Sequence, residues 1–180
     1  MANGQRPTTV TKAIMSINST PDQFGLMLVV FLVICFGAAS IGSVFTSSSV
    51  DTWYAQLKKP AFNPPRWIFG PVWSVLYFLM AVSAWLVWRN AGWKEGGAAL
   101  LLFLGQLGLN VAWSGVFFGL RQPGMALLVI FALLATIIAT AVGFLPFSRT
   151  AFWLMTPYAA WVSFASLLNF AIWRLNSGAA

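Results

Sequence analysis

Polar and aromatic side chains recur at helical spacing inside long apolar stretches of this sequence. Gln106, Asn110 and Ser114 follow one another at steps of four residues, and Trp113 lies beside them. On an α-helix these positions share one face. An amide that faces hydrocarbon without a hydrogen-bond partner is costly, so we expect this face to point into a helical bundle. Hydrogen bonding between helices is the simplest role for these groups, whereas the ring of Trp113 beside Asn110 favours ligand binding.

Two further helical faces carry large rings. Trp73 and Tyr77 are four residues apart, and Trp161, Ala165 and Asn169 continue at the same spacing. Large rings with one polar edge suit a pocket for a planar aromatic or sterol-like ligand. Plain core packing is the competing interpretation, and spacing alone leaves both open.

The residues needed for conventional catalysis and metal binding are nearly missing. The sequence has no histidine, Cys35 is its only cysteine, and its carboxylates are Asp22, Asp51 and Glu95. These counts exclude an intrachain disulfide, a Cys/His zinc site and a Ser-His-Asp triad. Paired-carboxylate chemistry is disfavoured, because the three acids fall in loops or near predicted helix ends. We therefore predict no catalytic residue and no metal site.

The composition indicates a chain that lies in lipid. Hydrophobic residues make up 59% of the sequence and charged residues only 7%, whereas a soluble domain carries about 25% charged residues. Ten basic and three acidic residues give a net charge of +7, and the basic residues are scattered along the chain. Because no block of Lys or Arg could follow a phosphate backbone, we set nucleic acid aside and expect the cations to face lipid headgroups.

Five apolar runs are each near the length of about 20 residues that a helix needs to cross a bilayer. We predict an all-α membrane protein, a bundle of five transmembrane helices spanning residues 24–45, 68–88, 98–120, 125–146 and 152–173. A polar tail over 1–23, with a short interfacial helix at 11–17, precedes this 24–176 domain, and a short tail over 177–180 follows it. The first run is longer than a signal-peptide core, although cleavage after it is an alternative.

The connection over residues 46–67 is the longest between predicted spans, and Asn63-Pro64-Pro65 cannot continue a helix. A long ordered loop on a compact bundle is often a lid or binding element. Five basic residues fall on each side of the predicted membrane, so the positive-inside rule gives no orientation. Tryptophans near the span ends fit an interfacial aromatic belt; they are Trp67, Trp88, Trp93, Trp153 and Trp173.

Residues 53–80 carry a distinctive combination of motifs, reading WYAQLKKPAFNPPRWIFGPVWSVLYFLM. Two further segments agree with it, NVAWSGVFFG at 110–119 and LNFAIWR at 168–174, with Pro157-Tyr158 and Trp161 before the latter. Together they resemble the translocator protein family, also called the tryptophan-rich sensory protein (TspO/MBR) or peripheral benzodiazepine receptor family. The resemblance covers roughly residues 24–176.

This resemblance implies a five-helix bundle, often a homodimer, with a ligand cavity covered by the first loop. Family members bind porphyrins such as protoporphyrin IX, haem-related tetrapyrroles, cholesterol in animals, and synthetic benzodiazepine-type or isoquinoline ligands. Carried over position by position, the ligand-binding residues would be Trp53, Pro60, Phe62, Asn63, Trp67, Trp73, Tyr77, Asn110, Trp113, Trp161, Ala165 and Leu168.

Two departures from the family pattern bear on the ligand. Ala61 stands where bacterial relatives can carry tryptophan, which would loosen the grip on a flat ring. The segment proposed as a cholesterol motif has Phe170 where a tyrosine is needed, so cholesterol is not the expected ligand and a bacterial membrane is the expected location.

The leading functional hypothesis is a tetrapyrrole-binding membrane protein that acts as sensor, regulator or carrier in tetrapyrrole and oxidative-stress metabolism. Without histidine it lacks the usual axial ligand for haem iron, so metal-free porphyrin should be preferred and no cofactor is required. Light- and oxygen-dependent porphyrin degradation is one alternative, implied by the resemblance. A small-molecule transporter is the other, although no charge lies within the predicted spans.

Overall fold

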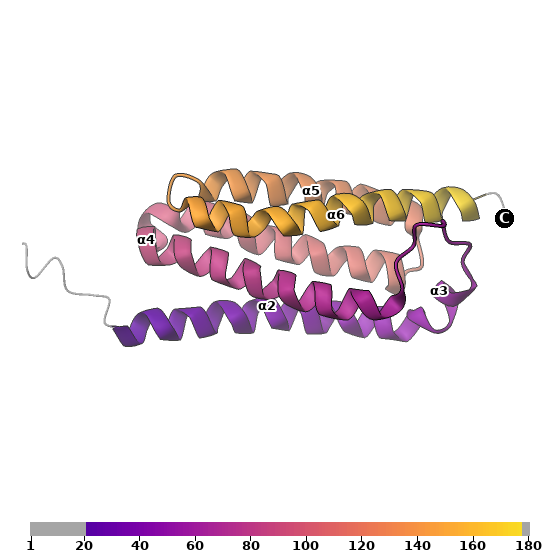
Figure 1. Cartoon of the computed structure of the whole chain (residues 1–180), viewed down its shortest axis with the longest axis horizontal. Helices are drawn as coiled ribbons and strands as arrows, with labels where there is room; N and C mark the ends of the chain where they lie inside the picture. The colour runs from indigo at the N-terminus through magenta and orange to yellow at the C-terminus, as the bar shows by residue number, and fades with distance from the viewer. Residues whose placement is uncertain (1–20, 178–180) are drawn as a thin grey trace, which may run out of the picture.

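The computed structural model describes residues 21–177, so the interfacial helix expected at 11–17 and most of both predicted tails lie outside the described part. The helices are α2 (Pro21–Val50), α3 (Trp53–Gln56), α4 (Arg66–Ser114), the π-helical turn η1 (Gly115–Gly119), α5 (Pro123–Phe144) and α6 (Arg149–Asn176). The long helices run along the long axis of the molecule, with α2 on one side and α5 and α6 on the other (Figure 1). The all-α prediction is confirmed over these residues.

Helix α4 is a hairpin rather than one straight helix. Together with η1 it forms a continuous helical segment of 54 residues, which would be about 80 Å long if straight, far more than one bilayer crossing needs. At Gly92 the backbone leaves the helical region, with φ 60° and ψ −167°, and the chain reverses, so that a first arm (66–91) and a second arm (93–114) run antiparallel (Figure 1). The described residues therefore contain five long helical segments, which overlap the five predicted spans.

Gly92→Ala is expected to destabilise the protein by about 1–3 kcal/mol, because the backbone region at Gly92 is one that essentially only glycine adopts. Gly105→Ala is the matched control: this glycine lies in the second arm and a Cβ there meets no atom within 4 Å, so the change should be neutral or stabilise by up to about 1 kcal/mol. Thermal unfolding in detergent measures both, and a Gly92→Ala variant as stable as Gly105→Ala would contradict this account of the hairpin.

Helix α2 extends to Val50, five residues into the segment that the sequence predicts as connection. The polar residues there remain helical because their hydroxyls bond to carbonyls of the preceding turn. Thr46 donates to the carbonyl of Gly42 (3.1 Å) and Ser48 to that of Phe45 (2.8 Å). Such bonds satisfy the hydroxyl without leaving the helix, so the connection begins at Asp51 and contains α3.

The Gly115–Gly119 pair packs inside the bundle. A Cβ added at Gly119 would lie 3.1 Å from Cδ1 of Phe45, and one at Gly115 would lie 3.7 Å from Cε2 of the same ring. The two glycines therefore let η1 approach α2 closely. From the sequence, contact within one bundle and contact between two copies were both open; the structure uses the pair within the chain.

Large aromatic and aliphatic side chains fill the centre of the bundle, with Tyr158, Phe31, Phe103 and Phe144 nearly inaccessible. Elsewhere the long helices expose apolar side chains along much of their length, as α2 does with Val33. An exposed apolar surface this extensive suits contact with lipid chains rather than water.

Candidate ligand-binding cavity

A cavity of about 660 Å³ lies between α2, both arms of α4, η1, α6 and the connection. Nine of the twelve residues predicted to bind a ligand line it. These are Asn63, Trp67, Trp73, Tyr77, Asn110, Trp113, Trp161, Ala165 and Leu168. Gln106, Asn110 and Ser114 are all buried, which confirms that their shared face points inward. The separate faces identified by helical spacing thus meet at one place.

Three predicted residues are not part of the cavity wall. Trp53 packs edge-on against Phe117 (ring centroids 5.8 Å apart), and the half-exposed Phe62 packs against Phe164 (6.3 Å). The carbonyl of Pro60 accepts a hydrogen bond from the backbone N–H of Asn63 (3.0 Å). These residues shape the connection around the cavity, and a direct contact of theirs with ligand stays a prediction.

Helix α2 supplies one wall that the predicted set does not include. Its lining residues are small or carry hydroxyls, and they are Ala39, Gly42, Ser43, Thr46 and Ser47, with Phe36 and Val50 at the two ends. They follow one another at alternating steps of three and one, the spacing of a helical face. This stripe is visible in the sequence and would have indicated a wall that leaves room for a guest.

Asn110 is held by two buried tyrosines. The hydroxyl of Tyr77 donates to Asn110 Oδ1 (2.7 Å), and Asn110 Nδ2 donates to the hydroxyl of Tyr158 (2.9 Å). The three residues come from the first arm of α4, the second arm and α6, so the network joins three helical segments. Asn110 lines the cavity, but both groups of its amide form hydrogen bonds within the bundle. The sequence favours a ligand as the main partner of this amide.

A second polar chain fixes Trp113. Its indole Nε1 donates to Asn169 Oδ1 (3.0 Å), and Asn169 Nδ2 donates to the carbonyl of Pro123 (2.8 Å). This bond links Asn169 of α6 to Pro123, the first residue of α5. With its N–H engaged, Trp113 offers the cavity an immobilised apolar ring.

Trp161 differs from Trp113 in one respect. Its Nε1 is buried and has no hydrogen-bond partner among the described residues, although its ring packs against Phe69 (5.8 Å) and Phe164 (5.6 Å). A buried donor left unpaired is costly. Because Trp161 lines the cavity, an acceptor on a bound molecule would relieve this cost.

The connection is fastened to the bundle at its α3 end and at its middle. Ser49 Oγ donates to the carbonyl of Phe118 (2.7 Å) just before the connection. At its middle, the backbone N–H of Lys58 donates to Asn176 Oδ1 (3.0 Å), and Asn176 Nδ2 donates to the carbonyl of Lys58 (3.0 Å). This pairing resembles that of two peptide groups and holds the connection against the end of α6.

Tyr54 links the connection to the cavity wall. Its hydroxyl donates to Asn63 Oδ1 (3.1 Å), and both residues line the cavity. Burial raises the pKa of the Tyr54 phenol, although the charge of Arg66 acts in the opposite direction. The hydroxyl therefore keeps the proton that it donates to Asn63 at neutral pH.

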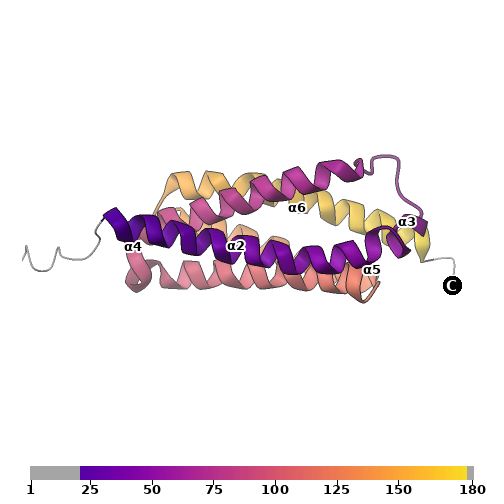
Figure 2. The same cartoon turned by 90° about the horizontal axis from the view of Figure 1, so that it is seen from below.

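The exposed part of the wall lies on two facing edges. On α2 it includes Ser43 and Ser47, and on the first arm of α4 it includes Trp67, Gly70 and Ser74. Seen from below, α2 and this arm separate toward the connection (Figure 2). The cavity thus has a side opening between two helices whose outer surfaces are apolar.

The polar groups on the cavity wall are almost all uncharged. Among residues 21–177, Arg66 is the only charged residue that lines it, and these residues contain no group of three His, Cys, Asp or Glu that could hold a metal ion. Rings, hydroxyls and amides remain, which suit an apolar guest with few polar atoms.

Comparison with known proteins agrees with this architecture. A sequence model described as the TspO/MBR family matches residues 30–174. A tryptophan-rich protein TspO from Archaeoglobus fulgidus is 43% identical over 152 residues, which cover 84% of this chain and 98% of that protein. The human translocator protein is 41% identical over 140 residues, covering 77% and 83%.

A tryptophan-rich sensory protein from Cereibacter sphaeroides is also similar, at 37% identity over 150 residues, with 83% of this chain and 91% of that protein covered. The matched region begins within α2 and ends within α6, so it includes every helical segment that lines the cavity. On these matches, the chain belongs to the TspO/MBR family and is a multi-pass integral membrane protein.

Proposed function

We propose that this protein binds flat hydrophobic ligands, and porphyrins in particular, within its helix bundle. The observation that carries the proposal is the cavity of about 660 Å³, a volume within the range of about 300–1,000 Å³ that small-molecule sites occupy. Four tryptophans line it, and they are Trp67, Trp73, Trp113 and Trp161. Indole rings offer a planar guest large contact area and stacking.

The connection acts as the cover of this site in our proposal. Tyr54 and Asn63 extend from it into the wall, and Asn176 holds it down at Lys58. Ligand-dependent movement of this cover would let the protein act as a sensor, regulator or carrier in tetrapyrrole and oxidative-stress metabolism. Membrane lipids and the bound porphyrin are then its small-molecule partners, and no cofactor is needed.

A homodimer is part of the same proposal. Small residues from two helices, Gly37 and Ala38 of α2 and Gly108 of the second arm, line a shallow groove on the outer surface of the bundle. Small side chains allow helices of two copies to approach closely in a membrane. The groove therefore supports the second copy that the family resemblance implies.

Titration with protoporphyrin IX tests the binding function. We expect saturable binding of one porphyrin per chain, with a shifted absorption band and quenching of tryptophan fluorescence. Haem should bind no more tightly than the metal-free porphyrin, because the chain has no histidine to ligate iron. Absorption changes that match those in protein-free micelles would contradict the proposal, and tighter binding of haem would contradict the preference for metal-free porphyrin.

A further inference from the structure

In the part of the chain that the structure describes, Arg66 is the one charged residue on the cavity wall. It begins α4, and its side chain is 57% exposed, so it lies at the exposed end of the cavity, next to the connection. Tyr77, eleven residues further along the first arm, is buried. At 1.5 Å per residue the two lie about 16 Å apart along the helix. The cavity therefore has a charged residue at one end and uncharged residues at the other.

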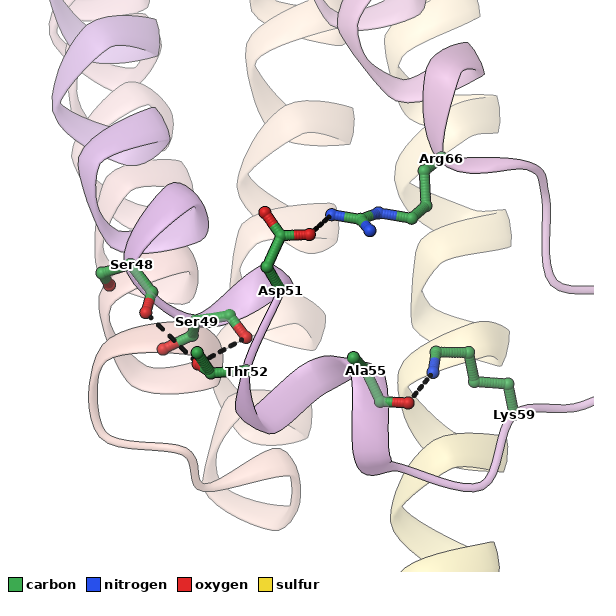
Figure 3. A network of polar contacts seen from close by, with 7 residues as sticks. All are labelled: Ser48, Ser49, Asp51, Thr52, Ala55, Lys59 and Arg66. Carbon is green, nitrogen blue, oxygen red and sulfur yellow. Dashed lines mark hydrogen bonds and ion pairs between the residues drawn. The ribbon is translucent and has the colours of Figure 1, made fainter.

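The present partner of Arg66 lies outside the cavity. Arg66 Nη2 donates to Asp51 Oδ1 at 2.5 Å, across the space between the end of α2 and the start of α4 (Figure 3). Asp51 does not line the cavity, and its side chain is 73% exposed. Exposed ion pairs contribute little to stability, so this one is easily exchanged for another anion. The other N–H groups of the guanidinium have no acceptor among the described residues.

The neighbouring cation is not available in the same way. Lys59 Nζ donates to the carbonyls of Ala55 (3.1 Å) and Leu57 (3.2 Å) and lies 4.8 Å from the centre of the Tyr54 ring. The bond to Ala55 is visible in Figure 3. Lys58 is exposed and does not line the cavity. An anionic group of a ligand at this end of the cavity would therefore meet Arg66 rather than a lysine.

We infer that Arg66 is a specificity-determining residue that selects flat ligands carrying a carboxylate at one edge, with Asp51 as the internal anion that the ligand replaces. This inference rests on the proposed binding function. The apolar part of the ligand lies inside the cavity, against Trp113 and Trp161. Its carboxylate lies at the exposed end, beside Arg66. A guanidinium binds a carboxylate through two parallel hydrogen bonds, which fixes the orientation of the ligand as well as its charge.

The test compares protoporphyrin IX, which has two carboxylates, with its uncharged dimethyl ester in a non-ionic detergent. Because the two also partition differently into micelles, the decisive quantity is the ratio of their dissociation constants in each variant. Arg66→Gln should reduce the preference for the free acid by about threefold to tenfold relative to the parent, with binding of the ester unchanged. Arg66→Lys should retain part of the preference, since it keeps the charge and loses the paired geometry.

Lys58→Gln is the matched control, because it removes the same charge from the same end of the molecule without touching the wall; it should leave the ratio within about twofold of the parent. Asp51→Asn should raise affinity for the free acid only. An unchanged ratio in Arg66→Gln, or an equal change in Lys58→Gln, would overturn the role of Arg66 while leaving porphyrin binding in place. Saturable binding of neither porphyrin would overturn the binding function and this inference together.

Discussion

Replacing Trp161 with alanine is expected to weaken protoporphyrin IX binding by at least about tenfold, and Trp113→Ala should do the same. Removing a buried aromatic anchor from the centre of a binding site typically costs about 2 kcal/mol or more, and about 1.4 kcal/mol corresponds to a factor of ten. Tryptophan quenching and the porphyrin absorption band measure the affinity. Trp153→Ala is the control, because that indole is 65% exposed and does not line the cavity.

Trp161→Phe separates the two contributions of this residue. The variant keeps an aromatic ring against Phe69 and Phe164 but removes the N–H that has no protein partner. If the N–H serves the ligand, affinity should fall by about threefold to tenfold, and the free protein should be at least as stable as the parent. Parental affinity in both Trp161→Ala and Trp113→Ala would refute the site.

Asn110→Ala is expected to destabilise the protein by about 2–4 kcal/mol, because it leaves the hydroxyls of Tyr77 and Tyr158 without their partner. Each buried polar group left unpaired costs about 1–3 kcal/mol, reduced somewhat where the unfolded chain finds partners within the membrane. Thermal unfolding of the ligand-free protein in detergent measures the loss. Asn90→Ala provides the control, since its amide donates to the carbonyl of Phe147 (2.9 Å) at an exposed site.

Removing the tyrosine hydroxyls as well shows whether Asn110→Ala loses stability through unpaired hydroxyls or through loss of side-chain volume. The variant Tyr77→Phe/Tyr158→Phe/Asn110→Ala should recover part of the stability lost in Asn110→Ala, because no orphaned hydroxyl remains. If the triple variant is the least stable and Asn90→Ala is as damaging as Asn110→Ala, the network does not stabilise the bundle in the way described here.

The inward direction of the polar faces could be predicted from the sequence, because it depends only on the helical period and on the cost of polar groups in lipid. The partners of those groups could not. Asn110 lies 33 residues from Tyr77 and 48 from Tyr158, and no local pattern relates such positions. The free N–H of Trp161 and the engaged N–H of Trp113 likewise follow from tertiary contacts, although both are tryptophans on inward faces.

The connection shows where the sequence was least informative. Its sequence lacks the regular helical spacing from which side-chain directions can be predicted. The family resemblance therefore assigns Trp53 and Phe62 to the site, but the sequence does not predict whether they line the cavity. Their hydrophilicity predicts a loop for the polar residues after Phe45, whereas their hydroxyls bond to the preceding turn and keep α2 helical. Hydrophilicity near a span end is thus a weak indicator of helix termination.

The side opening between α2 and the first arm of α4 changes how affinity has to be expressed. If the protein binds porphyrin as proposed, a porphyrin dissolved in acyl chains would reach the exposed wall residues Gly70 and Ser74 by diffusing in the plane of the bilayer, without first returning to water. Occupancy then follows the mole fraction of ligand in the lipid phase rather than its total molarity. Adding empty vesicles at constant protein and porphyrin should dilute the guest and lower occupancy, so dissociation constants for this protein are best given per mole of lipid.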